Sequence, residues 1–114
     1  MHEMSVAESL VETIIKEAQK INATPLKAVI SCGMLNPIND EVMQFAFEVV
    51  TRETVCEGME LEIVHIPWRA VCRDCGEKFD FDVYSPKCGK CDSTSMDMEE
   101  DAPLQLDEIE FDEN

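Results

Sequence analysis

The chain has 114 residues and a formal net charge of −16. This length is typical of one domain, and a separate module of well under about 70 residues would need a metal or a disulfide to stabilise it. The excess of carboxylates disfavours nucleic acid as a partner, because phosphate backbones are negative, and it favours cations or basic protein surfaces. No apolar run is long enough to span a bilayer, and the N-terminus lacks the basic start of a secretory signal. We therefore expect a cytoplasmic protein that does not associate with membranes, and whose cysteines are thiols or metal ligands.

Residues 4–22 are predicted to form an amphipathic helix, because apolar residues recur every three or four positions. These apolar residues are Val6, Ala7, Leu10, Val11, Ile14, Ile15, Ala18 and Ile21. Charged residues fall on the opposite face, so the apolar stripe should pack on the core. Asn22 is predicted to end the helix, and Pro25 lies beyond it.

A strand and a second helix are predicted next along the chain. Residues 27–33 are typical of a strand that ends in a turn at Gly33, and residues 34–38 form a predicted loop. Asn39 or Asp40 is predicted to cap the second helix, where acidic side chains favour the helix dipole. The predicted apolar stripe of this helix comprises Val42, Phe45, Ala46, Val49 and Val50.

Two further strands are predicted towards the C-terminus. Residues 59–66 alternate between apolar and acidic side chains, which is the pattern of a strand with one buried face. Residues 104–111 alternate as well, but a slip of one residue at Asp107 and Glu108 predicts a β-bulge. This last segment is predicted to return to the main sheet, and the alternative is a disordered acidic tail.

Four cysteines have the spacing of a metal site. The pairs are Cys72 with Cys75 and Cys88 with Cys91. A gap of two residues lets both thiolates of a pair reach one ion from a tight turn, for which Gly76 and Gly89 are expected to supply the backbone freedom. Four thiolates fill the tetrahedral shell of zinc and leave no open position. The sequence therefore predicts a structural zinc site that folds the segment around it.

Other interpretations of the cysteines remain open. Two disulfides would require an oxidising compartment, and a rubredoxin-like iron site would use the same four thiolates. A zinc ribbon that binds nucleic acid conflicts with the negative charge. Cys32 and Cys56 lie outside the set and are predicted to be buried thiols, and His65 is predicted to be a partly buried structural histidine.

The order of these elements predicts an α+β fold with a zinc-ribbon-like module inserted near the end. Residues 1–66 and 103–114 would form an α/β domain, and residues 67–102 would form the zinc-binding module.

The chain begins Met1-His2-Glu3, which offers donors for a second metal ion. The α-amine of Met1 and the amide nitrogen and imidazole of His2 can bind one ion through fused chelate rings, and Glu3 adds an amide or a carboxylate. A nitrogen-rich, nearly planar shell suits Ni(II), and it also suits Cu(II). The alternative is that a histidine near a chain terminus binds nothing.

Five segments together resemble the HypA/HybF family of hydrogenase maturation factors over nearly the whole chain. They are Met1-His2-Glu3-Met4-Ser5, Phe45-Ala46-Phe47-Glu48, Leu61-Glu62-Ile63, Cys72-Arg73-Asp74-Cys75-Gly76 and Cys88-Gly89-Lys90-Cys91. The resemblance implies a nickel metallochaperone that delivers Ni(II) for maturation of [NiFe] hydrogenase and, in some organisms, of urease. Its partners would be a HypB-like GTPase and the large subunit of the hydrogenase. The resemblance also implies a fold with helices packed on a small mixed β-sheet.

The resemblance also assigns residues to nickel. His2, with Met1 and Glu3 nearby, would bind the ion within the domain of residues 1–66 and 103–114. Asp40 is a further candidate ligand by the same resemblance, although a helix-capping acid is the role we expect for it. The loop from Cys32 to Pro37 departs from the family pattern.

Two other classes of function stay open from the sequence. One is a rubredoxin-like electron carrier, and the other is a zinc-ribbon module that only binds proteins, for which His2 would be dispensable. An enzyme is not expected, because no nucleophile with a paired base and no glycine-rich phosphate loop is present in the sequence.

Overall fold

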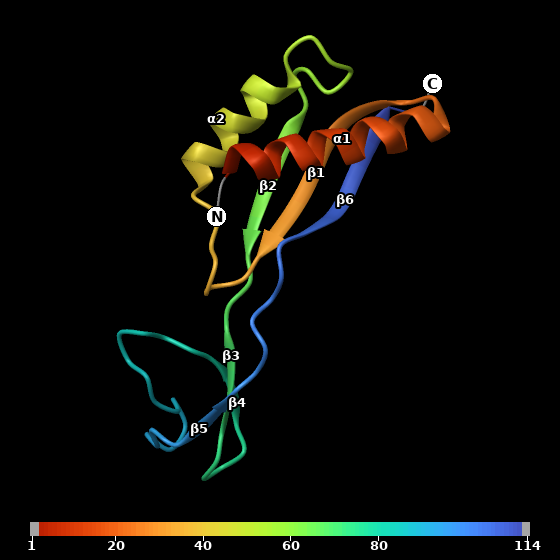
Figure 1. The fold of residues 1–114 in the computed structure, drawn as a ribbon. Coiled ribbons are helices and arrows are strands. Elements are labelled where there is room, and N and C mark those ends of the chain that lie inside the picture. The colour runs from red at the N-terminus through yellow and green to blue at the C-terminus, as the bar shows by residue number, and fades with distance from the viewer. Residues whose placement is uncertain (1–2, 113–114) are drawn as a thin grey trace.

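The computed structural model describes residues 3–112, which form two helices and six strands (Figure 1). The strands build two three-stranded sheets at opposite ends of an elongated molecule. We call β2-β1-β6 the main sheet and β4-β3-β5 the distal sheet. Neither helix in this described part is long and apolar enough to cross a membrane. The elements are α1 (Glu3–Ile21), β1 (Thr24–Cys32), α2 (Asp40–Thr51), β2 (Glu60–His65), β3 (Arg69–Cys72), β4 (Lys78–Asp80), β5 (Met96–Met98) and β6 (Gln105–Asp112).

The main sheet is mixed, as the family resemblance implies. β1 runs parallel to β2 and antiparallel to β6. The parallel connection passes through α2, and both helices lie on the same side of the sheet (Figure 1). Ala28, Ile30 and Leu61 are buried in the core that the helices share with this side. The α+β class, with helices on a small mixed sheet, is therefore confirmed.

The first helix has the predicted apolar face. Its buried residues are Ala7, Leu10, Val11, Ile14 and Ala18. Val6 and Ile15 are partly buried against the same core, whereas Ile21 at the end of the helix is exposed. Asn22 has a φ of 52°, the left-handed region in which helices often end. The predicted stop at Asn22 is confirmed.

The second helix begins where predicted but buries a different stripe. Asn39 is the N-cap, and its side-chain oxygen accepts a hydrogen bond from the Val42 amide (3.0 Å). Met43 and Phe47 are buried, whereas Val42 is 48% and Phe45 is 62% exposed. The predicted stripe was therefore wrong at Val42 and Phe45. The helix has two adjacent apolar stripes, one with Met43 and Phe47 and one with Val42 and Phe45. Periodicity alone could not decide which of the two faces the core.

The C-terminal strand joins the main sheet and contains the predicted bulge. Val29 pairs with Glu108 and the next residue, Ile30, pairs with Leu106, so Asp107 is the extra residue. The bulge restores the phase of the strand, and Leu106 and Ile109 both pack partly against the core. The predicted return to the sheet is confirmed, and the alternative of a disordered tail is wrong for residues up to 112.

Two chain segments that run between the sheets are tied to each other. Trp68 donates its indole N–H to the carbonyl oxygen of Glu99 (2.6 Å), and its ring meets Phe81 edge-on at a centroid distance of 5.7 Å. The Glu99 amide in turn donates to the carbonyl of Arg69 (2.9 Å). Two segments, residues 66–68 and 99–104, therefore connect the distal sheet to the main sheet, and we call them the neck (Figure 1).

Asp101 fixes the upper end of this neck to the loop that follows β1. Its two carboxylate oxygens accept hydrogen bonds from the amides of Met34 and Leu35, both at 2.9 Å. A Cβ at Gly33 would lie 2.5 Å from the carbonyl oxygen of Ala102, so only glycine permits this approach. The loop from Cys32 to Pro37, which departs from the family pattern, is thus the loop that binds Asp101.

Candidate metal centres

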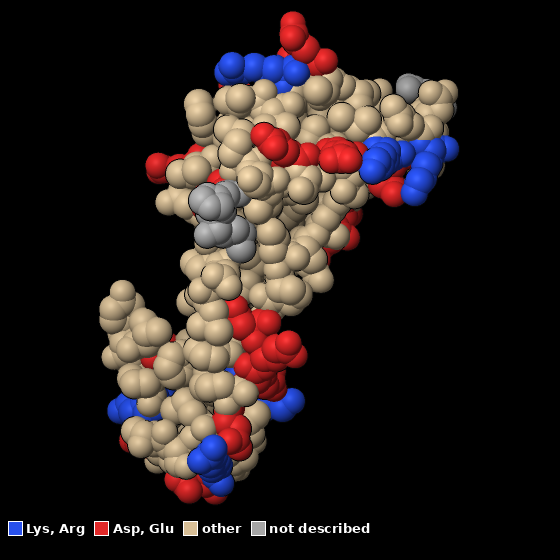
Figure 2. Space-filling model, in the orientation of Figure 1, with Lys and Arg blue, Asp and Glu red and all other residues tan. Residues whose placement is uncertain are grey.

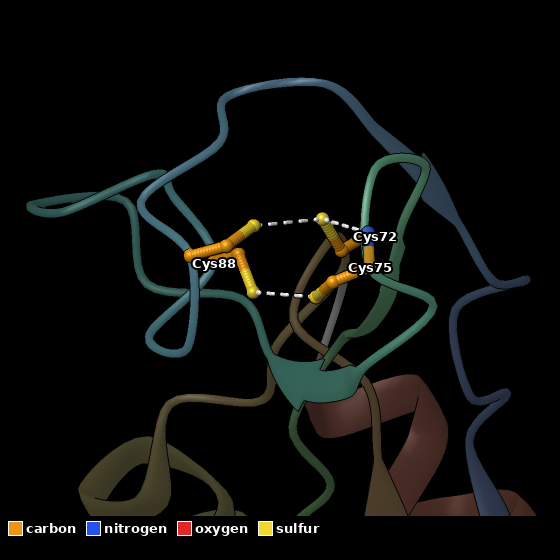
Figure 3. A group of neighbouring side chains, drawn as sticks. Cys72, Cys75 and Cys88 are labelled. Carbon is orange, nitrogen blue, oxygen red and sulfur yellow. Dashed lines mark hydrogen bonds between the residues drawn. The ribbon is translucent and has the colours of Figure 1, made fainter.

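The four paired cysteines meet at the distal sheet, from two loops that face each other (Figure 3). The Sγ atoms of Cys72 and Cys91 lie 3.5 Å apart, and those of Cys75 and Cys88 lie 3.6 Å apart. All four sulfurs lie within 4.8 Å of one another. A tetrahedral zinc–thiolate shell with bonds of about 2.3 Å has sulfur–sulfur edges of about 3.8 Å. The arrangement therefore fits a four-coordinate zinc ion.

Each cysteine pair is built on a turn whose amides point at sulfur. The amide of Cys75 donates to the Sγ of Cys72 (3.5 Å), and the amide of Lys90 donates to the Sγ of Cys88 (3.4 Å). Gly76 follows the first pair with a φ of 77°, as predicted. In the second turn the left-handed residue is Asp92, with a φ of 60°, rather than the predicted glycine at position 89. Aspartate tolerates this region better than most residues.

Backbone amides also stabilise the thiolate form of Cys72. The hydrogen bond from the Cys75 backbone lowers the pKa of the Cys72 thiol to about 6, so this thiol ionises at neutral pH. The backbone of Ser93 favours the thiolate of Cys91, but the neighbouring sulfurs, led by Cys72, raise the pKa of Cys91 to about 12. Four thiolates at this spacing repel one another, and a divalent cation removes that repulsion. The electrostatics of the cluster thus favour a bound metal.

The two remaining cysteines are buried thiols, as predicted. Cys32 and Cys56 are both fully buried beside the main sheet. Burial raises the pKa of the Cys56 thiol, which therefore stays protonated at neutral pH. Cys32 lies at the end of β1, and its Sγ is 3.4 Å from Nδ1 of His65.

The predicted nickel residues Met1 and His2 lie outside the described residues, whereas Glu3 and Asp40 lie within them. Glu3 opens α1, and its carboxylate accepts a hydrogen bond from the amide of Asn39 (3.1 Å). This bond joins the first turn of α1 to the start of α2 (Figure 1).

Asp40 does not cap the helix, because Asn39 takes that role. Its Oδ1 lies 2.6 Å from Nε2 of His65 instead. The interaction between Asp40 and His65 could not be found from the sequence, because the two residues are 25 positions apart and neither belongs to a recognisable motif.

Fold and site together define a class of small α+β protein with a closed four-cysteine metal centre. A family model described as "Hydrogenase/urease nickel incorporation, metallochaperone, hypA" matches residues 1–111. The hydrogenase maturation factor HypA of Azotobacter vinelandii is 34% identical over 111 residues, which cover 96% of this chain and 98% of that protein. The hydrogenase maturation factor HybF of Proteus vulgaris is 30% identical over 112 residues, which cover 97% and 99%.

A solved structure shares the fold. The solution structure of the Ni metallochaperone HypA from Helicobacter pylori aligns with a TM-score of 0.62 and 27% identity, and the alignment covers 97% of each chain. The chain belongs to the HypA family of hydrogenase maturation factors. The rubredoxin-like alternative is therefore not favoured.

Proposed function

We propose that this protein is a nickel metallochaperone that delivers Ni(II) for maturation of [NiFe] hydrogenase. The family match over residues 1–111, which includes the Met1-His2-Glu3 start, carries this proposal. Nickel would bind at His2, Met1 and Glu3, with Asp40 as a further ligand. The protein would act in the cytoplasm with a HypB-like GTPase and the large subunit of the hydrogenase.

The two metals would have different roles in this proposal. Cys72, Cys75, Cys88 and Cys91 would hold a structural zinc ion in the module of residues 67–102, because four thiolates leave no coordination position for exchange. The nickel ligands would belong to the domain of residues 1–66 and 103–114. A terminal amine, an imidazole and carboxylates form an accessible shell that can exchange ligands with a recipient protein.

The surface charge supports a cationic cargo. Acidic side chains outnumber basic ones by 25 to 9 in the sequence, and they gather along one side of the neck between the sheets (Figure 2). Such a surface attracts divalent cations and basic protein surfaces and repels nucleic acid.

The proposal is tested by metal analysis of untagged protein, whose free α-amine must be retained. We expect one zinc per chain and uptake of about one nickel at neutral pH, with nickel affinity falling in acid as protons compete for the amine and the imidazole. His2→Ala should abolish tight nickel binding and leave zinc content unchanged. Glu8→Ala is the control, because Glu8 is an exposed residue of α1 outside the proposed nickel shell. Undiminished nickel uptake by His2→Ala would refute the terminal site.

A further inference from the structure

His65 ends the helix-facing row of β2, at the edge of the core. Leu61 and Ile63 precede it in that row, and their partners on β1 are Ala28 and Ile30. The partner of His65 is Cys32, so imidazole and thiol lie on the same side of the sheet. His65 itself is exposed, so its ring lies at the rim of the core and not inside it.

Both ring nitrogens of His65 have a partner. Nδ1 lies 3.4 Å from the Sγ of Cys32, and Nε2 lies 2.6 Å from Oδ1 of Asp40. Cys32 is fully buried, so its thiol holds the Nδ1 side of the His65 ring towards the core. The side chains of His65 and Asp40 are 36% and 57% exposed, so the Nε2 side of the ring is open to solvent and to an ion.

The spacing of Nε2 and Oδ1 matches two ligands of one ion. Two donors 2.6 Å apart can each bind a transition metal at about 2.0–2.1 Å, with an angle of about 80° at the metal. That angle is close to the separation of adjacent positions in a planar or octahedral shell. Ligating histidines commonly hold their orientation through a bond from the other ring nitrogen, which is the position of Cys32 here.

The first turn of α1 lies next to the start of α2, where Asp40 is located. The Glu3 carboxylate is bound to the amide of Asn39, the residue next to Asp40. Among the residues that the structure describes, only the four paired cysteines bring three or more ligand atoms within 4.8 Å. His65 and Asp40 therefore offer two donors, which is half of a four-coordinate shell, and other donors are needed to complete it.

We propose that His65 is a ligand of the nickel ion, binding it through Nε2 beside Asp40, with Cys32 as the positioning residue. The proposal rests on the proposed function, because the terminal amine and His2 supply the other half of the shell. It assigns both histidines of the chain to one ion. Two imidazoles and a carboxylate suit Ni(II) in an exposed site.

The test is nickel titration and X-ray absorption of untagged, zinc-loaded protein. We expect two imidazoles per nickel in the wild type and one in His65→Asn, with an affinity loss of about tenfold or more for His65→Asn and for Asp40→Asn. Glu41→Gln is the matched control for Asp40→Asn, because it removes a neighbouring carboxylate in the same helical turn. Cys32→Ser should keep two imidazoles but weaken nickel binding less than His65→Asn.

A measurement on the wild type covers the case in which His65→Asn does not fold. Nitrogen-15 spectra of the histidine rings should show the Nε2 signal of His65 shifting as one equivalent of nickel is added. A shift confined to His2 would overturn the proposal, as would one imidazole per nickel in both the wild type and His65→Asn.

The outcomes separate this proposal from the proposed function. If His2→Ala loses nickel while His65→Asn binds it unchanged, the terminal site stands and His65 is only structural. If His65→Asn loses nickel while His2→Ala keeps it, the pair of His65 and Asp40 stands and the terminal site falls. A wild-type protein that takes up no nickel would overturn both.

Discussion

The two ends of the molecule are stabilised by different means. The main sheet and its helices enclose a cluster of thirteen buried residues, most of them aliphatic. Between residues 67 and 102 the buried apolar residues are only Ala70, Cys72 and Cys88, and two of these three belong to the four-cysteine cluster. β4 and β5 have three residues each, which is too short for a self-sufficient sheet.

The contrast separates a fold that depends on apolar burial from one that depends on a metal. A region without a core cannot offset the entropy of ordering its chain, and metal binding then becomes part of its folding free energy. The two ends should therefore respond independently to loss of metal and to loss of core volume. The two ends are joined by the neck, whose segments are linked by the hydrogen bond from Trp68 to Glu99.

Removal of zinc should have the largest effect. Structural zinc contributes on the order of 10 kcal/mol to the folding of a small site. Chelation of zinc, or Cys75→Ser, should abolish amide-exchange protection in β3, β4 and β5 and leave that of β1 intact. The measurement is residue-resolved hydrogen exchange together with zinc analysis.

Cys56→Ala is the matched control, because it removes a buried thiol from the main core rather than from the cluster. It should lower the stability of the main sheet and leave the zinc content unchanged. An unaltered melting curve after complete loss of zinc would show that the ion is not structural.

Loss of core volume should have the second-largest effect, and at the opposite end. Ile30 is a fully buried residue of β1, and Ile30→Ala should lower the free energy of unfolding of the main sheet by about 2–5 kcal/mol. Val64→Ala, at a partly exposed position on the neighbouring strand, should cost much less. Denaturant unfolding followed by far-UV circular dichroism measures both. If Ile30→Ala also released zinc, the two ends would not be independent.

The same contrast explains what could be predicted from the sequence. The cysteine spacing predicted the cluster, because ligand geometry is local and two short turns are enough to build it. The phase slip at Asp107 predicted the bulge in β6, because alternation records which residues face the core. The return of the last strand to the main sheet followed from its regularly spaced apolar residues.

Features that depend on tertiary contacts could not be predicted. Both stripes of α2 are apolar, so only the tertiary packing of the helix decides that Met43 and Phe47 are buried and Val42 and Phe45 are exposed. The distal strands were not predicted, because three-residue strands leave too little pattern to detect. The interaction of His65 with Asp40 joins the end of β2 to the start of α2, and no local rule connects those positions.

An electrostatic test on the open face of the main sheet should show the smallest effect. Lys27 lies between Glu60 and Glu62 of β2, with its Nζ 3.4 Å and 3.2 Å from their carboxylates. Hydrogen bonds to Glu62 and then Glu60 raise the pKa of Lys27 above its ordinary value of 10.5. A raised pKa in the folded state means that the stabilisation is complete below 10.5 and is lost as pH rises through the higher folded value.

Lys27→Gln should therefore lower the melting temperature at pH 7 by less than Ile30→Ala does, because both carboxylates that face Lys27 are exposed to water, which weakens their attraction to the lysine. The difference from the wild type should shrink as pH rises beyond 10.5, since the wild-type lysine then loses its charge as well. Lys16→Gln is the control, because Lys16 pairs with Glu12 on an exposed face of α1. A difference between Lys27→Gln and the wild type that stayed constant from pH 7 to about pH 11 would assign the contribution of Lys27 to the packing of its aliphatic stem rather than to its charge.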